Sequence, residues 1–236
     1  MADITFSGTT GTVSTAFDTL WLDTGANVAV NAGAAGTGHA VNTGTGDEAI
    51  PAIRSDSSTL TITAGSFTGG DGVASNLYPE CAIYSRNDAV TISGGTFSAG
   101  ANPSGIGQTA AKILTPTSCA ISGGTFSGGA STDQFGGGCG LLLSLSAVNA
   151  TISGGTFTKG AGTGVGTGVD GYSLLFAVKG TCTLTLSGGT FTGVARGTIE
   201  TGSKIRVNTT PGITPTRLDG TAWTSTIGIG YIDYSP

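Results

Sequence analysis

Hydrophobic and polar positions alternate along this chain in one short phrase that occurs five times. Each copy contains Ile or Leu, then Ser or Thr, two small residues, Ser or Thr, and Phe. The copies are Leu60–Phe67, Val90–Phe97, Cys119–Phe126, Ala150–Phe157 and Leu184–Phe191. Their phenylalanines are separated by 30, 29, 31 and 34 residues, so each copy marks one repeated structural unit.

The alternation inside the phrase predicts a strand. Val90 and Ile92 point to one face, while Thr91 and Ser93 point to the other, as a period of two requires. The two small residues that follow end this strand at a corner, because glycine accepts unusual backbone angles. A second strand then begins, with Phe97 directed inward.

A third strand precedes each phrase, at Ala52–Ile53, Ala82–Ile83, Ala111–Ile113, Leu141–Leu143 and Leu174–Phe176. We expect its inward residues to form one file of Ile53, Ile83, Ile113, Leu143 and Phe176. Three short strands per turn of about 30 residues predict an all-β fold, a right-handed parallel β-helix. Its neighbouring turns should pair at about 4.8 Å.

Gly-rich segments of variable length separate each Phe from the next turn. They are Gly69–Pro79, Gly100–Gln108, Gly128–Gly138 and Gly160–Tyr172. Because all of them leave the same corner of the coil, stacking should gather these loops along one edge.

The ends of the chain lack the phrase. Residues 1–48 are expected to form an N-terminal cap and degenerate first coils, and residues 49–213 the β-helix repeats. Residues 214–236 are rich in aromatic side chains and are expected to form a C-terminal cap or an oligomerisation tail.

Composition argues against several partners. With 10% charged residues, a net charge of -5 and 9 Lys plus Arg, the chain is expected to have no basic stripe and no nucleic-acid partner. Its longest strongly apolar stretch, Leu141–Leu145, is too short to cross a membrane, and its N-terminus lacks the features of a signal peptide. The four cysteines have no CxxC spacing and His39 is the sole histidine, so we expect reduced, buried thiols, no metal site and no cofactor.

The sequence gives little evidence of a catalytic site. Polysaccharide-cleaving β-helices need several carboxylates, often with basic partners, on adjacent turns. The candidate acids are scattered, and none recurs at equivalent positions: Asp71, Glu80, Asp88, Asp133 and Asp170. We therefore expect no catalytic residues.

Outward strand positions are expected to be nearly all Ser or Thr. Three files result: Thr61, Thr91, Thr151 and Thr185; Ser66, Thr96, Thr125, Thr156 and Thr190; and Thr68, Ser98, Ser127, Thr158 and Thr192. Such arrays are similar to the faces of insect and bacterial ice-binding proteins. Alternatively, Thr is simply a favourable outward residue in a strand, and Ala120 interrupts the first file.

The loops contain aromatic and amide side chains suited to sugar or protein surfaces. The candidate binding residues are Asn76, Tyr78, Asn102, Asp133, Gln134, Asp170 and Tyr172. The alternative is that these loops are spacers without a function.

The hexapeptide Ile-Ser-Gly-Gly-Thr-Phe, at Ile92–Phe97 and Ile152–Phe157, resembles repeats in β-helical bacterial surface proteins and in bacteriophage fibre, spike and adhesin proteins. The resemblance covers about residues 50 to 213. It implies a non-enzymatic phage virion protein at the virion surface or outside the cell, either a receptor-binding adhesin or a capsid or tail decoration. Its implied partners are a host receptor or glycan, other virion proteins, and copies of itself, such as a trimer. The alternatives are an ice-binding β-solenoid and a bacterial surface protein that binds or cleaves glycans.

Overall fold

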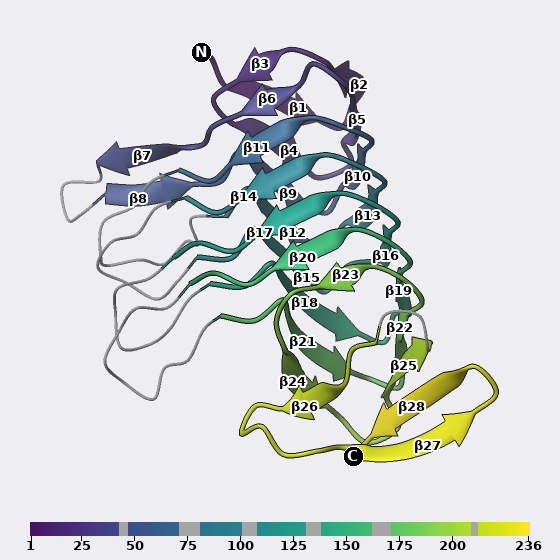
Figure 1. The fold of residues 1–236 in the computed structure, drawn as a ribbon. Coiled ribbons are helices and arrows are strands. Elements are labelled where there is room, and N and C mark those ends of the chain that lie inside the picture. The colour runs from purple at the N-terminus through teal and green to yellow at the C-terminus, as the bar shows by residue number, and fades with distance from the viewer. Residues whose placement is uncertain (43–46, 71–80, 101–107, 131–137, 162–170, 209–211) are drawn as a thin grey trace.

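The computed structural model describes residues 1–42, 47–70, 81–100, 108–130, 138–161, 171–208 and 212–236. Over these residues the chain forms strands and no α-helix. None of them, accordingly, belongs to a helix that could span a membrane. Figure 1 shows one coil that winds in the right-handed sense from the N-terminus to the C-terminus. The fold is a right-handed parallel β-helix, which confirms the prediction from the sequence.

Three stacked sheets form the walls of the coil (Figure 1). Sheet A contains, in order, β1 (Ile4–Ser7), β4 (Leu20–Asp23), β9 (Ile53–Asp56), β12 (Ile83–Arg86), β15 (Ala111–Leu114), β18 (Leu141–Ser146), β21 (Leu174–Lys179), β24 (Ala195–Ile199) and β26 (Pro215–Arg217). Sheet B contains β2 (Thr10–Val13), β5 (Asn27–Val30), β10 (Thr59–Ile62), β13 (Ala89–Ile92), β16 (Ser118–Ile121), β19 (Ala150–Ile152), β22 (Thr183–Leu186), β25 (Lys204–Asn208), β28 (Tyr231–Ser235) and β27 (Thr224–Gly228). Sheet C contains β3 (Ala16–Phe17), β6 (Ala35–Gly36), β11 (Ser66–Thr68), β14 (Thr96–Ser98), β17 (Thr125–Ser127), β20 (Thr156–Thr158) and β23 (Thr190–Phe191).

Successive turns pair in register. In sheet B the central residues of the phrase form one buried file, which consists of Ile62, Ile92, Ile121, Ile152 and Leu186. A slip by one residue would turn every inward side chain of that strand outward, so burial of this file determines the register.

Sheet C buries a stack of phenylalanine rings, one from each copy of the phrase. Four of the rings, Phe67, Phe97, Phe126 and Phe157, are fully buried, and Phe191 is half-buried at the end of the stack. The distances between the centroids of neighbouring rings are 5.4, 4.7, 4.9 and 4.9 Å. These distances are close to the spacing of paired strands, as expected for rings directed inward from successive turns.

Phe17 extends the stack although no copy of the phrase surrounds it. By register, Gly36 lies between Phe17 and Phe67. A Cβ atom on Gly36 would come within 2.4 Å of Cε2 of Phe17. The missing side chain therefore makes room for the Phe17 ring, whose centroid lies 6.2 Å from that of Phe67.

The inward residues of sheet A differ from the predicted single file. Ile53 and Ile83 pair with each other, but Ile83 pairs with Ala111, so Ile113 lies one inward position further along its strand. Leu143 and Phe176 follow Ile113, while Ser55 and Ser85 occupy that second file in the earlier turns. All five predicted residues are buried, but in two files. The error arose because a period of two does not distinguish adjacent inward positions.

Two separate constraints, one on the backbone angle and one on space, require glycine at the Gly-Gly corner between sheets B and C. Gly95 has φ 103°, and its equivalents in the other copies have φ between 98° and 121°, a region that L side chains rarely adopt. Gly94 has no such angle, but a Cβ on it would lie 2.2 Å from the carbonyl oxygen of Thr63 in the preceding turn. Close stacking of the corners thus excludes a side chain there.

The first turns of the coil lie within residues 1–36. Ile4 pairs with Leu20, so strands β1 to β3 make a turn of 16 residues that carries no insertion. An antiparallel hairpin, β7 (His39–Asn42) and β8 (Asp47–Ile50), then precedes β9. A turn can therefore close with or without additional residues between its sheet C strand and the next strand of sheet A.

The C-terminal tail packs on the last turn. Strand β26 extends sheet A, while β28 pairs antiparallel with β25 and carries β27 on its outer edge. Tyr234 is buried, and Trp223 and Ile232 pack against the core. Asp233 holds the hairpin through Arg206 Nε, at 2.7 Å, and Lys204 Nζ, at 3.0 Å.

The ring stack predicts that replacing a Phe by Ala lowers the free energy of unfolding by an amount that depends on the position of the ring in the stack. Phe126→Ala should lower the free energy of unfolding by about 3–5 kcal/mol, because it leaves a cavity between two buried rings. Phe191→Ala is the matched control and should cost less, since its ring is half-buried and has one ring neighbour among the described residues. Urea denaturation of both variants measures the difference. Equal losses would contradict a continuous stack.

Candidate binding surfaces

The corner between sheets C and A receives the insertions of the chain. Each of β11, β14, β17 and β20 is followed by a long segment before the next strand of sheet A begins. The β7–β8 hairpin occupies the same corner one turn earlier, as Figure 1 shows. The structure thus places the described stems of the predicted loops along one edge of the helix.

The described stems of these loops are stacked glycine backbones. Gly138 donates its N–H to the carbonyl oxygen of Gly129 at 2.8 Å, and Gly160 donates to that of Gly138 at 2.8 Å. A Cβ on Gly138 would lie 1.7 Å from the carbonyl oxygen of Gln108, and one on Gly160 would lie 1.9 Å from that of Gly129. The abundance of glycine in the loops therefore has a structural cause at their stems.

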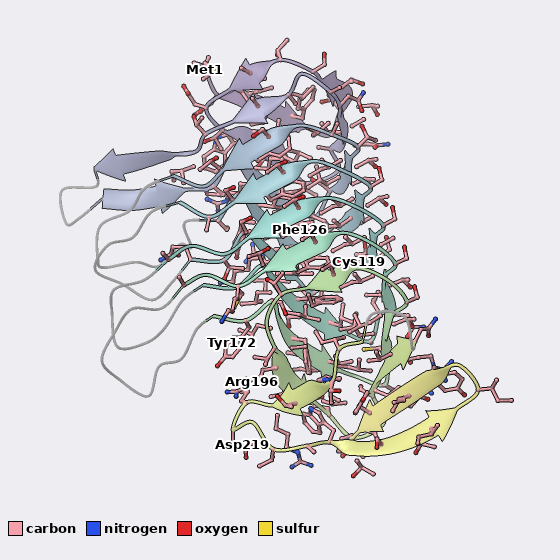
Figure 2. All side chains as sticks on the ribbon, viewed as in Figure 1. Met1, Cys119, Phe126, Tyr172, Arg196 and Asp219 are labelled. Atoms are coloured by element: carbon pink, nitrogen blue, oxygen red, sulfur yellow. The ribbon has the colours of Figure 1, made fainter. Side chains whose placement is uncertain are left out.

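Six of the seven predicted binding residues lie outside the described residues: Asn76, Tyr78, Asn102, Asp133, Gln134 and Asp170. Tyr172 is described. It is half-buried in the stem that leads into β21, and its carbonyl oxygen accepts the N–H of Gly140 at 3.0 Å. Its ring lies 5.5 Å from Cζ of Arg196 on sheet A, and Figure 2 shows both side chains on the same flank of the helix.

Hydroxyl side chains cover the outer faces of sheets B and C. In-register pairing aligns Thr61, Thr91, Thr151 and Thr185 in one file that Ala120 interrupts. The two Ser and Thr files of sheet C are aligned in the same way. On these two sheets the outward positions of the repeats agree with the prediction.

Sheet A differs, and here the prediction of nearly uniform Ser and Thr is wrong. One outward file, which we call the mixed file, consists of Trp21, Arg54, Tyr84, Lys112, Leu142, Leu175 and Arg196. All seven side chains are half-buried. The sequence did contain the signal, because Arg54 and Tyr84 directly follow the inward residues Ile53 and Ile83.

Cations and rings alternate in the N-terminal half of the mixed file. Cζ of Arg54 lies 5.0 Å from the centroid of the Trp21 ring. Nζ of Lys112 lies 5.8 Å from the centroid of the Tyr84 ring. Each cation therefore rests over an aromatic ring of the preceding turn, an attraction worth about 0.5–1 kcal/mol at exposed sites.

Positive charge is concentrated on this wall of the helix. Six of the nine basic residues of the chain lie in the described strands of sheet A: Arg54, Arg86, Lys112, Lys179, Arg196 and Arg217. The same strands contain two acidic residues, Asp23 and Asp56. Register places three of them, Arg54, Lys112 and Arg196, in the mixed file.

An ion pair neutralises part of this charge. Arg86 Nε donates to Oδ2 of Asp56 at 3.1 Å, and this guanidinium holds the pKa of Asp56 below its usual range. The pair adds no net charge to the wall. Lys179 Nζ also lies 3.9 Å from Oε1 of Glu200, which follows β24, so a second basic side chain of this wall has an acidic neighbour.

Asp88 is the described member of the predicted candidate acids, and it is fully buried. It accepts the N–H of Ser58 at 2.7 Å and the hydroxyl of Ser85. Burial raises the pKa of its carboxyl group. These contacts join two turns at the corner between sheets A and B, so Asp88 has a structural role. Asp71, Glu80, Asp133 and Asp170 lie outside the described residues.

The four cysteines lie in the interior of the protein. All four cysteines are buried and free, as the sequence predicts. Burial raises the pKa of the Cys119 thiol to about 12, so it stays protonated at neutral pH. Among the described residues, no three His, Cys, Asp or Glu side chains form a group that could hold a metal ion.

Comparison with known proteins gives no relative from which a function could be inferred. No protein family matches the chain. Neither curated proteins nor solved structures give a match.

The buried Asp88 predicts a pH-dependent stability. Its folded-state pKa is raised, so the folded protein binds this proton more tightly than the unfolded chain, and stability should fall as pH rises from the unfolded pKa through the folded one. Asp88→Asn retains an acceptor for Ser58 and removes the titration. The variant should therefore gain stability relative to the wild type between acidic and neutral pH. A difference in unfolding free energy that does not change with pH would refute this account.

Proposed function

We propose that this chain is a non-enzymatic structural protein of a phage virion that recognises a host surface through its loops. It serves as a receptor-binding adhesin or as a capsid or tail decoration. The observation that carries the proposal is the single edge, between sheets C and A, where the insertions leave and re-enter the coil.

The coil and its insertions have different physical requirements. Register and glycine stacking constrain each turn, so its residues repeat. The insertions vary in length and content, and a surface that discriminates partners needs unlike groups at defined places. A rigid rod that presents variable loops along one edge suits host recognition.

The proposal includes the partners and location that fit such a protein. The loops bind a host receptor or glycan, and the remaining surface contacts other virion proteins or further copies of the chain, as in a trimer. The protein acts at the virion surface or outside the cell, without a nucleic-acid or membrane partner. Support for self-association comes from the outer hairpin of the tail, where Ile227 and Ile229 are 81% and 101% exposed.

Ice binding is the second candidate, and the aligned hydroxyl files of sheets B and C favour it. A regular lattice of hydroxyls suits a regular ligand. Against it, Ser and Thr mix along the files of sheet C, and Ala120 interrupts the file of sheet B.

Two variants separate these functions. In the first, the segments 71–80, 101–107, 131–137 and 162–170 are replaced by short Gly-Ser links, which leaves the described stems in place. In the second, outward Thr96, Thr125 and Thr156 of sheet C are changed to Tyr. We expect binding to bacterial cells or their surface glycans to be lost in the first variant alone.

Both variants should retain the β-helix, which circular dichroism and thermal unfolding can verify. Full cell binding by the loop-less variant would overturn the adhesin proposal. Ice shaping by the wild type that disappears in the Tyr variant would establish the hydroxyl face in its place.

A further inference from the structure

A second surface with a ligand chemistry of its own lies on the outer face of sheet A. We propose that the mixed file binds a linear acidic polysaccharide, which lies along the helix axis across the strands. Arg54 and Lys112 would contact its carboxylates. This inference goes beyond the proposed function, because it uses a wall of the helix and not its loops.

The spacing of the cations suits such a polymer. Arg54 pairs with Tyr84, and Tyr84 pairs with Lys112, so the two cations are two turns apart in one file. At the usual strand spacing this separation is about 10 Å. It is close to the length of one extended disaccharide, so a glycan with a carboxylate on every second sugar would meet both cations.

The two aromatic rings restrict the conformations of the cationic side chains before a ligand binds. Arg54 rests over Trp21 and Lys112 rests over Tyr84, which restricts two long side chains before a ligand arrives. Ordering a flexible side chain on binding costs conformational entropy, and prior ordering removes part of that cost. Further along the file, Leu142 and Leu175 offer half-buried apolar surface to the C–H groups of sugars.

Charge directs an anion to this wall. The described strands of sheet A contain six basic and two acidic residues, whereas the whole chain has a net charge of -5. The strands of sheet C contain no charged residue. An anionic polymer is therefore attracted to sheet A and repelled by the molecule as a whole, which favours one face over the others.

The ring geometry favours a glycan over a single-stranded nucleic acid. Proteins that bind single strands stack bases on open aromatic faces. Here Arg54 lies over the face of Trp21, and Lys112 lies over the face of Tyr84, so cations occupy faces that bases would need. Carboxylates that approach the cations from outside need no open ring face.

The test measures binding of the full chain to immobilised hyaluronan, which carries a carboxylate on every second sugar. Neutral dextran and a thymidine oligonucleotide serve as comparison polymers. Hyaluronan binding should weaken as salt rises, because exposed charges are screened. Lys112→Gln should reduce the affinity about threefold to tenfold, and Tyr84→Leu, which keeps every charge, about twofold to fivefold.

Lys204→Gln is the matched control, since it removes one positive charge from sheet B, where Asp233 keeps its contacts with Arg206. Its affinity should equal that of the wild type. The loop-less variant should also retain hyaluronan binding, which separates this site from the loops. Absence of hyaluronan binding, equal binding of the oligonucleotide, or unchanged affinity of Lys112→Gln would each overturn the proposal.

Discussion

In-register pairing of successive turns is the constraint on which this structure depends. Each residue of a strand lies beside its counterpart in the next turn, so side chains form files through the molecule. Inward files make the core, and outward files make the Ser and Thr surfaces of sheets B and C and the mixed file of sheet A. The long insertions lie at the corner between sheets C and A, whereas at the corner between sheets B and C backbone layers such as Gly94 on Thr63 leave no room for a side chain.

Packing between layers also explains residues that break the repeat. Where a turn lacks Phe in the stack, Gly36 lies beneath the ring of Phe17. On sheet A, Gly197 pairs with Phe176, and a Cβ there would lie 1.9 Å from the Phe176 carbonyl oxygen. At these two places a glycine lies beside a phenylalanine of a neighbouring turn, which keeps the core filled without overlap.

The periodic part of the chain was predictable because one physical rule acts on every turn. The phrase revealed the three strands, the ring stack around Phe126 and the edge where loops gather. The inward residues of sheet A were assigned to one file because the alternation of apolar and polar residues does not by itself determine the register. The mixed file was missed because it appears only when single residues such as Arg54 and Tyr84 are aligned by strand pairing. The antiparallel strand β28 was missed because it depends on tertiary packing, which a sequence repeat does not reveal.

In the five repeats the corner between sheets B and C has one fixed length and the corner between sheets C and A does not, and two insertions measure this difference. One Ala is inserted between Gly123 and Gly124, where the corners stack. The same Ala is inserted after Gln134, in the segment that separates β17 from β18. Urea denaturation should show a loss of several kcal/mol or failure to fold for the first variant, and a change within about 0.5 kcal/mol for the second. Equal free energies of unfolding for the two variants would contradict the account.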